Sequence, residues 1–283
     1  MPVKRYLSLV TFAHTIFALP FALLAAVLAA GGVPPAGKLL WIVVAMVGAR
    51  SAAMAFNRIA DRAIDGMNVR TKTRDIPAGR VSVLEASVFC ALSAAVFVLA
   101  AWRLNPLCLA LSPVALLVVL GYSYTKRVTA FSHLVLGLGL AIAPVGAWIA
   151  VTGAFDLPPV ALGLCVLFWV AGFDVIYSLQ DEDFDRAHGL FSLPARLGAR
   201  RALNVSTAFH ALSLSLLYAV FVLVSGGAAF GAGVVTAGAF LVRQHALVKP
   251  GDLTRVDGAF FTANGWLSVA VFVCGAADVF LRR

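Results

Sequence analysis

The chain has 283 residues, of which 61% are hydrophobic and 12% are charged, and its mean hydropathy is +0.95. These values exclude an ordinary soluble domain and indicate an integral membrane protein. The net charge of +9 also occurs in nucleic-acid-binding proteins, but here the Lys and Arg residues fall at alternate ends of apolar segments. We therefore expect the protein to lie in a lipid bilayer and to bind no nucleic acid.

Nine segments are apolar and long enough for a membrane-spanning helix of about 20 residues. They are residues 11–31, 39–56, 83–101, 107–122, 131–152, 159–178, 202–225, 228–247 and 260–280. Because a helix satisfies its own backbone hydrogen bonds inside a bilayer, we predict an all-α fold. The expected architecture is a polytopic membrane bundle of about nine transmembrane helices around a central cavity, formed by a single domain over residues 1–283.

The basic residues predict how the bundle is oriented. With the N-terminus in the cytoplasm, 18 of the 22 Lys and Arg residues lie on the cytoplasmic side, as the positive-inside rule requires. This asymmetry predicts a multi-pass protein of the inner (cytoplasmic) membrane whose C-terminus lies outside. Eleven of the 13 acidic residues fall on the cytoplasmic side as well, which the rule does not require. We therefore expect the active site there, beside the long polar connections 57–82 and 179–201.

The second predicted span ends in NRIADRAID, residues 57–65. Residues four apart share a helix face, so Asn57, Asp61 and Asp65 are expected to form one polar ridge. The negative helix C-terminus disfavours each acid there by about 0.3–1 kcal/mol, and a divalent cation reverses that effect. Mg²⁺ suits such a site, because it combines a few carboxylates with water and substrate phosphates. The alternative is a solvated helix end whose acids pair with nearby arginines.

Asp181 and Asp185 repeat this spacing 120 residues after the first cluster. Each cluster contains an Asp-Arg-Ala triplet, and each follows the second span of a possible four-helix unit. A weak internal repeat of this kind would bring the clusters face to face across a central cavity. Because the same arrangement occurs twice, the metal site is favoured over the arginine-paired alternative.

Other polar residues are expected to complete the site. Arg70 and Arg74 follow the first cluster and suit a diphosphate, although a positive-inside flank explains their number equally well. Tyr122 and Lys126 share a helix face at the end of the fourth span and could bind phosphate oxygens, or could be an interfacial aromatic with a snorkelling lysine. Asp174 lies within the apolar stretch WVAGFDVIYSL, where an ionisable group indicates a functional position.

These residues resemble the signatures of the UbiA superfamily of intramembrane aromatic prenyltransferases. The family pattern N-D-x-x-D-x-x-x-D is matched by Asn57, Asp61 and Asp65, with Arg58 where many members have a second acid. The family pattern D-x-x-x-D is matched by Asp181 and Asp185, and the pattern Y-x-x-x-K by Tyr122 and Lys126. The segments AGFDVIYSLQDEDFDR and HTIFALPFAL are most similar in sequence to the 4-hydroxybenzoate polyprenyltransferase branch.

The resemblance implies a Mg²⁺-dependent enzyme. It would transfer a polyprenyl group from polyprenyl diphosphate to a ring carbon of 4-hydroxybenzoate, or of a related aromatic acid, in ubiquinone or menaquinone biosynthesis. The implied roles divide the residues into three sets. The metal ligands are Asn57, Asp61, Asp65, Asp181 and Asp185; the substrate contacts are Asn57, Arg70, Arg74, Tyr122 and Lys126; the catalytic residues are Asp174, Tyr122 and Lys126.

Two alternatives stay open at this point. Homogentisate, dihydroxynaphthoate or haem could replace the benzoate acceptor, because enzymes for such acceptors share the signatures and a fold does not determine a substrate. An ion-coupled secondary transporter would also contain intramembrane acids and internal repeats. That alternative predicts acids near the bilayer midplane and interrupted helices. The resemblance implies no particular oligomeric state.

Overall fold

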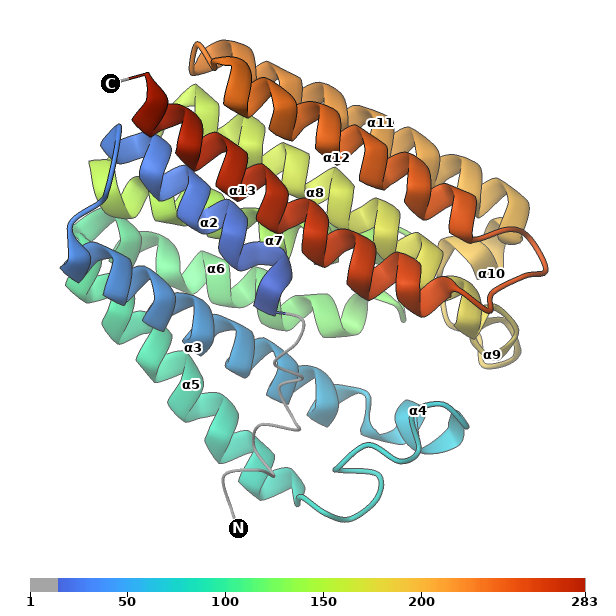
Figure 1. Ribbon diagram of the computed structural model, residues 1–283. Helices are drawn as coiled ribbons and strands as arrows, with labels where there is room; N and C mark the ends of the chain where they lie inside the picture. The colour runs from blue at the N-terminus through green and yellow to red at the C-terminus, as the bar shows by residue number, and fades with distance from the viewer. Residues whose placement is uncertain (1–14, 283) are drawn as a thin grey trace.

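The computed structural model describes residues 15–282, which are almost entirely helical (Figure 1). Nine long helices cross the described part of the molecule. They are α2 (Thr15–Ala30), α3 (Ala36–Ala60), α5 (Val83–Leu104), α6 (Pro106–Thr125), α7 (Ser132–Thr152), α8 (Leu157–Ser178), α11 (Ala199–Leu223), α12 (Ala228–Leu247) and α13 (Asn264–Leu281). The shorter elements are α4 (Arg62–Met67), η2 (Leu179–Asp181), α9 (Glu182–Ala187), α10 (Leu193–Leu197) and the π-helix η3 (Gly258–Ala263).

The helices lie where the apolar segments predicted them, so the predicted all-α class is confirmed. Among residues 15–282, seven helices are long and apolar enough to cross a membrane, and the apolar part of α2, Phe17–Ala30, is shorter. The predicted start of the first span, residues 11–14, lies outside the described residues. α12 is not among these seven helices, and its final turns contain Arg243, Gln244 and His245. The chain is a multi-pass membrane protein.

Helix ends are set by local capping. Ser82 and Glu85 form a capping box at the start of α5, which satisfies two backbone N–H groups that have no partner within the helix. Asn105 caps α6, with Pro106 at the first helical position, where its missing N–H is not needed. Gly153 ends α7 with a φ of 78°, in the left-handed region that glycine adopts without strain.

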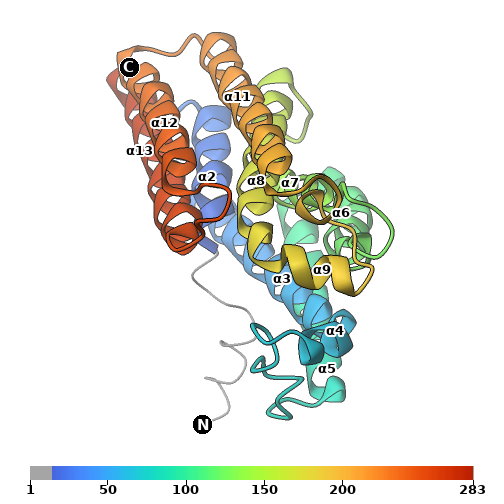
Figure 2. The same ribbon diagram turned by 90° about the vertical axis from the view of Figure 1, so that its right-hand side faces the viewer.

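α8 is the central helix of the bundle. It packs against α7 on one side and α11 on the other (Figure 2). The approach to α7 is close because Gly137 has no side chain: a Cβ there would lie 2.2 Å from the carbonyl oxygen of Leu167. Trp169 and Phe173 of α8 pack edge to face and form an aromatic cluster with Phe17 of α2. α8 is thereby held rigidly between two halves of the bundle.

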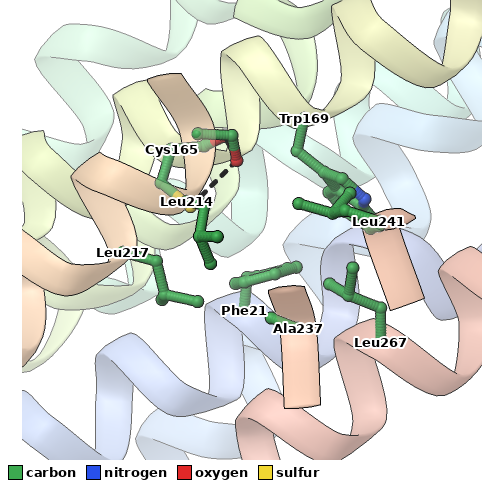
Figure 3. A pocket seen from close by; sticks show the side chains of 9 residues that line it. Phe21, Cys165, Trp169, Leu214, Leu217, Ala237, Leu241 and Leu267 are labelled. Carbon is green, nitrogen blue, oxygen red and sulfur yellow. Dashed lines mark hydrogen bonds between the residues drawn. The ribbon is translucent and has the colours of Figure 1, made fainter. Parts of the chain in front are cut away.

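One apolar void lies among α2, α8, α11, α12 and α13 (Figure 3). Its volume is about 10 Å³, close to the smallest space that holds one water molecule. At its edge the Ser213 hydroxyl donates to the carbonyl oxygen of Cys165 at 2.9 Å. The void is therefore a small packing defect in the core rather than space for a ligand.

The polar connections gather at one end of the bundle. α4, α9 and α10 lie at the end opposite to the C-terminus (Figure 1). At the other end the connections are short, and Asp278 of α13 accepts hydrogen bonds there from the backbone N–H groups of Gly227 and Phe230. This acid, one of the two predicted to lie outside, caps the N-terminus of α12. The long polar connections are the part of the fold that builds a site.

Candidate active site

The first acidic motif lies across a helix break. α3 ends at Ala60, Asp61 has φ −92° and ψ 4°, and Asp65 lies in the first turn of α4. The predicted ridge of Asn57, Asp61 and Asp65 is thus divided between two helices: Asp61 follows the end of α3, and Asp65 is the fourth residue of α4. Asp65 thus lies at a positive helix N-terminus, which favours an acid. Asn57 stays on α3 and donates to Asp61 Oδ2 at 2.8 Å.

The second motif has the same construction. α8 is followed by η2, which ends at Asp181, and Asp185 lies in the first turn of α9. In both motifs the first acid is at the break and the second acid is four residues further along, in a short helix of six residues. The two clusters are equivalent in local structure as well as in spacing.

Each of the four motif acids pairs with a basic side chain from another part of the chain. Asp65 and Asp185 are almost completely buried, with exposed side-chain fractions of 7% and 1%. The closest nitrogen–oxygen distances are Arg127–Asp61 3.0 Å, Arg74–Asp65 2.6 Å, Arg70–Asp181 2.5 Å and Lys126–Asp185 3.0 Å. The four motif acids are therefore matched one to one by four basic side chains.

These side chains surround a single cavity of about 170 Å³ at the polar end of the bundle. The wall is built from the ends of α3, α6 and α8 and from the segments around α4 and α9, which lie together in Figure 2. All ten residues predicted for the site line it: Asn57, Asp61, Asp65, Arg70, Arg74, Tyr122, Lys126, Asp174, Asp181 and Asp185. Arg58, which stands where many members of the resembled family have an acid, is not among the lining residues.

The acids do not form a preassembled metal site. Within residues 15–282, no three acidic, histidine or cysteine side chains gather as a single ion requires, because each acid faces a basic partner. One carboxylate oxygen nevertheless has unused capacity: Asp65 Oδ2 is buried and lacks a hydrogen-bond partner in the described part of the chain. Asp185 Oδ2 is also buried, and its neighbour is the ammonium of Lys126 at 3.0 Å. Such hard oxygens fit Mg²⁺, which needs only a few protein ligands when water and phosphate oxygens complete its shell.

The electrostatic environment of Asp61 also favours a bound cation. Burial raises the pKa of its carboxyl, the hydrogen bond from Arg127 opposes this, and the neighbouring Asp65 raises the pKa again. A group in this situation gains from any additional positive charge placed beside it. A cation between the two motifs would supply that charge.

Sequence reasoning missed two residues that contact the motif acids. Arg127 donates to Asp61 and to the carbonyl oxygen of Ala60, and Asn68 donates to Asp181 at 3.0 Å. Arg127 follows Lys126 directly and was explained as part of a positive-inside flank. Asn68 lies between the predicted site residues Asp65 and Arg70, and it belongs to no regular helical spacing that would have indicated its role.

Two further polar side chains lie inside the bundle. His133 is almost completely buried, and its Nδ1 atom is 2.7 Å from Asp174 Oδ2. Arg50 of α3 has buried Nε and Nη2 atoms that find no hydrogen-bond partner among residues 15–282. It lies seven residues, or two turns, before Asn57 and on the same helix face. Buried guanidinium nitrogens of this kind suit an anionic ligand.

Comparison with known proteins identifies the family. The model of the UbiA prenyltransferase family matches residues 18–267. A curated relative, the 4-hydroxybenzoate octaprenyltransferase of Nitrosospira multiformis, is 32% identical over 255 residues, which cover 90% of this chain and 87% of the relative. The corresponding protein of Francisella tularensis subsp. tularensis is 28% identical over 261 residues, or 92% and 90% of the two chains.

Solved structures agree with this match. The apo structure of a UbiA homolog from Aeropyrum pernix K1 superposes with a TM-score of 0.83 at 36% identity, covering 95% of this chain and 98% of that one. A UbiA homolog from Archaeoglobus fulgidus, solved with DMAPP and Mg²⁺, has the same fold at 18% identity, with a TM-score of 0.76 over 98% and 99% of the chains. The chain therefore belongs to the UbiA prenyltransferase family.

Proposed function

We propose that this protein transfers a polyprenyl group from polyprenyl diphosphate to a ring carbon of 4-hydroxybenzoate or a closely related aromatic acid. In this reaction the bond between the prenyl C1 and the diphosphate oxygen breaks, and its electron pair leaves with the diphosphate. An electron pair of the aromatic ring forms the new carbon–carbon bond to the allylic cation. The ring carbon then loses its proton to a base, which restores aromaticity.

The observation that carries the proposal is the set of four ion pairs around one cavity. In the structure each motif acid pairs with one base. We infer that Arg70, Arg74 and Lys126 turn from their acids to the diphosphate oxygens. The carboxylates of Asp65, Asp181 and Asp185 that they release would hold Mg²⁺ together with Asp61, which keeps its contact with Arg127. The positive Mg²⁺ then lies beside the acids and the negative diphosphate beside the bases, so no charge is left buried and unpaired.

The chain supplies the remaining contacts. Asn57 has a side-chain oxygen that can assist at the metal, and the Tyr122 hydroxyl can donate to a diphosphate oxygen. Bound Mg²⁺ would supply positive charge that stabilises the departing diphosphate. Asp174 accepts the hydrogen of the acceptor hydroxyl, which orients the ring. The connections around α4 and α9 would shield the allylic cation from water.

The acceptor is proposed from two observations. The curated relatives are named 4-hydroxybenzoate octaprenyltransferases, and Arg50, two turns before Asn57 on the same face of α3, has two guanidinium nitrogens without a partner among the described residues. A carboxylate on the acceptor would satisfy that guanidinium in a bidentate contact. Homogentisate and dihydroxynaphthoate acids would do the same, whereas an acceptor without a carboxylate would leave Arg50 unpaired.

The position of the site supports a transferase over an ion-coupled carrier. The motif acids lie where α3 and α8 end, at the polar end of the bundle, and a carrier would need them near the middle of the spans. The excess of basic residues on that end supports the orientation proposed here. The active site faces the cytoplasm and the C-terminus lies on the outer side of the inner membrane.

The acceptor assignment predicts a selective effect of Arg50. In membranes supplied with polyprenyl diphosphate, Mg²⁺ and an acceptor, we expect Arg50→Gln to raise the KM for 4-hydroxybenzoate by about 10- to 100-fold, because a charge-assisted contact is worth about 1.5–3 kcal/mol. The KM for polyprenyl diphosphate should not change. The measurement is product formation against acceptor concentration.

A second acceptor provides the control. A phenol of similar size without a carboxylate should react poorly with the wild type, and Arg50→Gln should not weaken it further. A variant that affects both acceptors equally would contradict the carboxylate contact. Transfer to neither acceptor by the wild type would contradict the proposed reaction.

A further inference from the structure

A buried histidine connects Asp174 to the polar segment that follows the second acidic motif. His133 lies in the first turn of α7 and is only 1% exposed. Its Nδ1 atom is 2.7 Å from Asp174 Oδ2, and its Nε2 atom accepts a hydrogen bond from the backbone N–H of Leu193 at 3.3 Å. The imidazole therefore bridges a carboxylate that lines the cavity and a backbone group that belongs to α10.

The two contacts fix which ring nitrogen carries hydrogen. A backbone N–H can only donate, so Nε2 must present its lone pair to Leu193. The hydrogen of the imidazole is then on Nδ1 and is donated to Asp174. Among the described residues, His133 is the one side chain that hydrogen-bonds to this carboxylate. The Oδ2 atom of Asp174 is thus fixed by this hydrogen bond, while the Asp174 side chain keeps 23% of its surface exposed at the cavity.

The segment at the other end of the bridge is anchored to the diphosphate side of the site. The backbone N–H of Leu190 donates to the carbonyl oxygen of Asp185 at 2.9 Å, and that of Phe191 donates to the carbonyl oxygen of Lys126 at 2.7 Å. Both carbonyls belong to residues whose side chains form one of the four ion pairs. His133 therefore receives its backbone hydrogen bond from a segment positioned by the diphosphate end of the cavity.

We propose that His133 is a positioning residue for acceptor prenylation: it holds the Asp174 carboxylate in the orientation that receives the acceptor hydroxyl. This role rests on the proposed function, because it assumes that Asp174 contacts the acceptor. His133 itself does not touch the substrate. It acts by fixing the rotamer of Asp174 and by tying that rotamer to the segment between Asp185 and α10.

Two substitutions separate positioning from packing. His133→Leu keeps an apolar side chain of similar size but removes both hydrogen bonds. His133→Gln keeps both, since its amide nitrogen can donate to Asp174 and its amide oxygen can accept from Leu193. We expect His133→Leu to lower kcat by about 10²-fold, as misplacement of a reacting group typically does, with the KM for polyprenyl diphosphate unchanged. His133→Gln should restore most of the rate.

A double variant and a matched control complete the experiment. Asp174→Asn combined with His133→Leu should be no slower than Asp174→Asn alone, because both changes remove the same function. His245→Gln makes the same substitution at a half-buried, hydrogen-bonded histidine outside the cavity and should leave the rate unchanged. Thermal unfolding of each purified variant in detergent reports folding separately from rate.

The outcomes are distinguishable. Equal loss of rate in His133→Leu and His133→Gln, or additive effects in the double variant, would overturn the positioning role while the wild type remains active. A rise in the KM for polyprenyl diphosphate similar to the fall in kcat would overturn it as well. If the wild type forms no prenylated aromatic acid in the same assay, the proposed function fails, and the positioning role fails with it.

Discussion

Asp181→Asn is expected to reduce prenyl transfer at saturating Mg²⁺ by about 10²–10³-fold, the usual effect of removing one group that stabilises developing charge. Asparagine has nearly the same shape, so it can keep the hydrogen bond with Asn68. It cannot balance the charge of Arg70, and it is a weaker ligand for a divalent cation. The measurement is the initial rate of product formation by purified enzyme, with Mg²⁺ varied from limiting to saturating concentrations.

Asp183→Asn is the matched control for this variant. Asp183 belongs to the same acidic segment, two residues further along, but it is exposed and does not line the cavity. We expect it to keep the wild-type rate and the wild-type Mg²⁺ dependence. Full activity of Asp181→Asn at saturating Mg²⁺ would contradict its assignment as a metal ligand.

Exchanging the two charges of the Arg70–Asp181 pair should leave the enzyme inactive. The double variant Arg70→Asp, Asp181→Arg can still form an ion pair, so a purely structural salt bridge predicts that the double variant recovers what each single variant loses. Under the partner exchange proposed here, the acid must face the metal and the base must face the diphosphate. We therefore expect a loss of about 10³-fold or more, because one charged contact with the metal and one with the diphosphate are lost together.

The exposed pair Arg186–Glu182 offers the corresponding control. Its members are four residues apart on α9, with 2.8 Å between nitrogen and oxygen, and neither lines the cavity. The exchange Arg186→Glu, Glu182→Arg should preserve both folding and rate. Recovery of activity by the exchanged Arg70–Asp181 pair, measured on folded protein, would show that the pair matters only for structure.

The spans and the grouping of the site could be predicted from the sequence, because both depend on local patterns. Apolar segments of sufficient length specify membrane helices. The same four-residue spacing occurs in Asp61 with Asp65 and in Asp181 with Asp185, at equivalent places in two parts of the chain. This repeat indicated that the two clusters face each other across one cavity. Arg74 was chosen for its nearness to the acids, and it does pair with Asp65.

The rest depends on tertiary contacts that leave no local pattern. Residues 57–65 contain neither glycine nor proline, so local propensity favours one continuous helix through Asp61. The break coincides with Arg127, which takes the carbonyl oxygen of Ala60 and one oxygen of Asp61. Similarly, His133 is 41 residues from Asp174 in the chain, and only the packing of α7 against α8 brings them together.

The binding of inorganic diphosphate to the purified protein, measured by calorimetry with and without Mg²⁺, tests the central claim most directly. If three of the four ion pairs exchange partners with a magnesium diphosphate, each ligand must strengthen the binding of the other by the same factor. We expect an increase in diphosphate affinity with Mg²⁺ of about 10-fold or more, and its loss in Asp181→Asn. Equal affinity in Mg²⁺ and in excess chelator would contradict the proposed site.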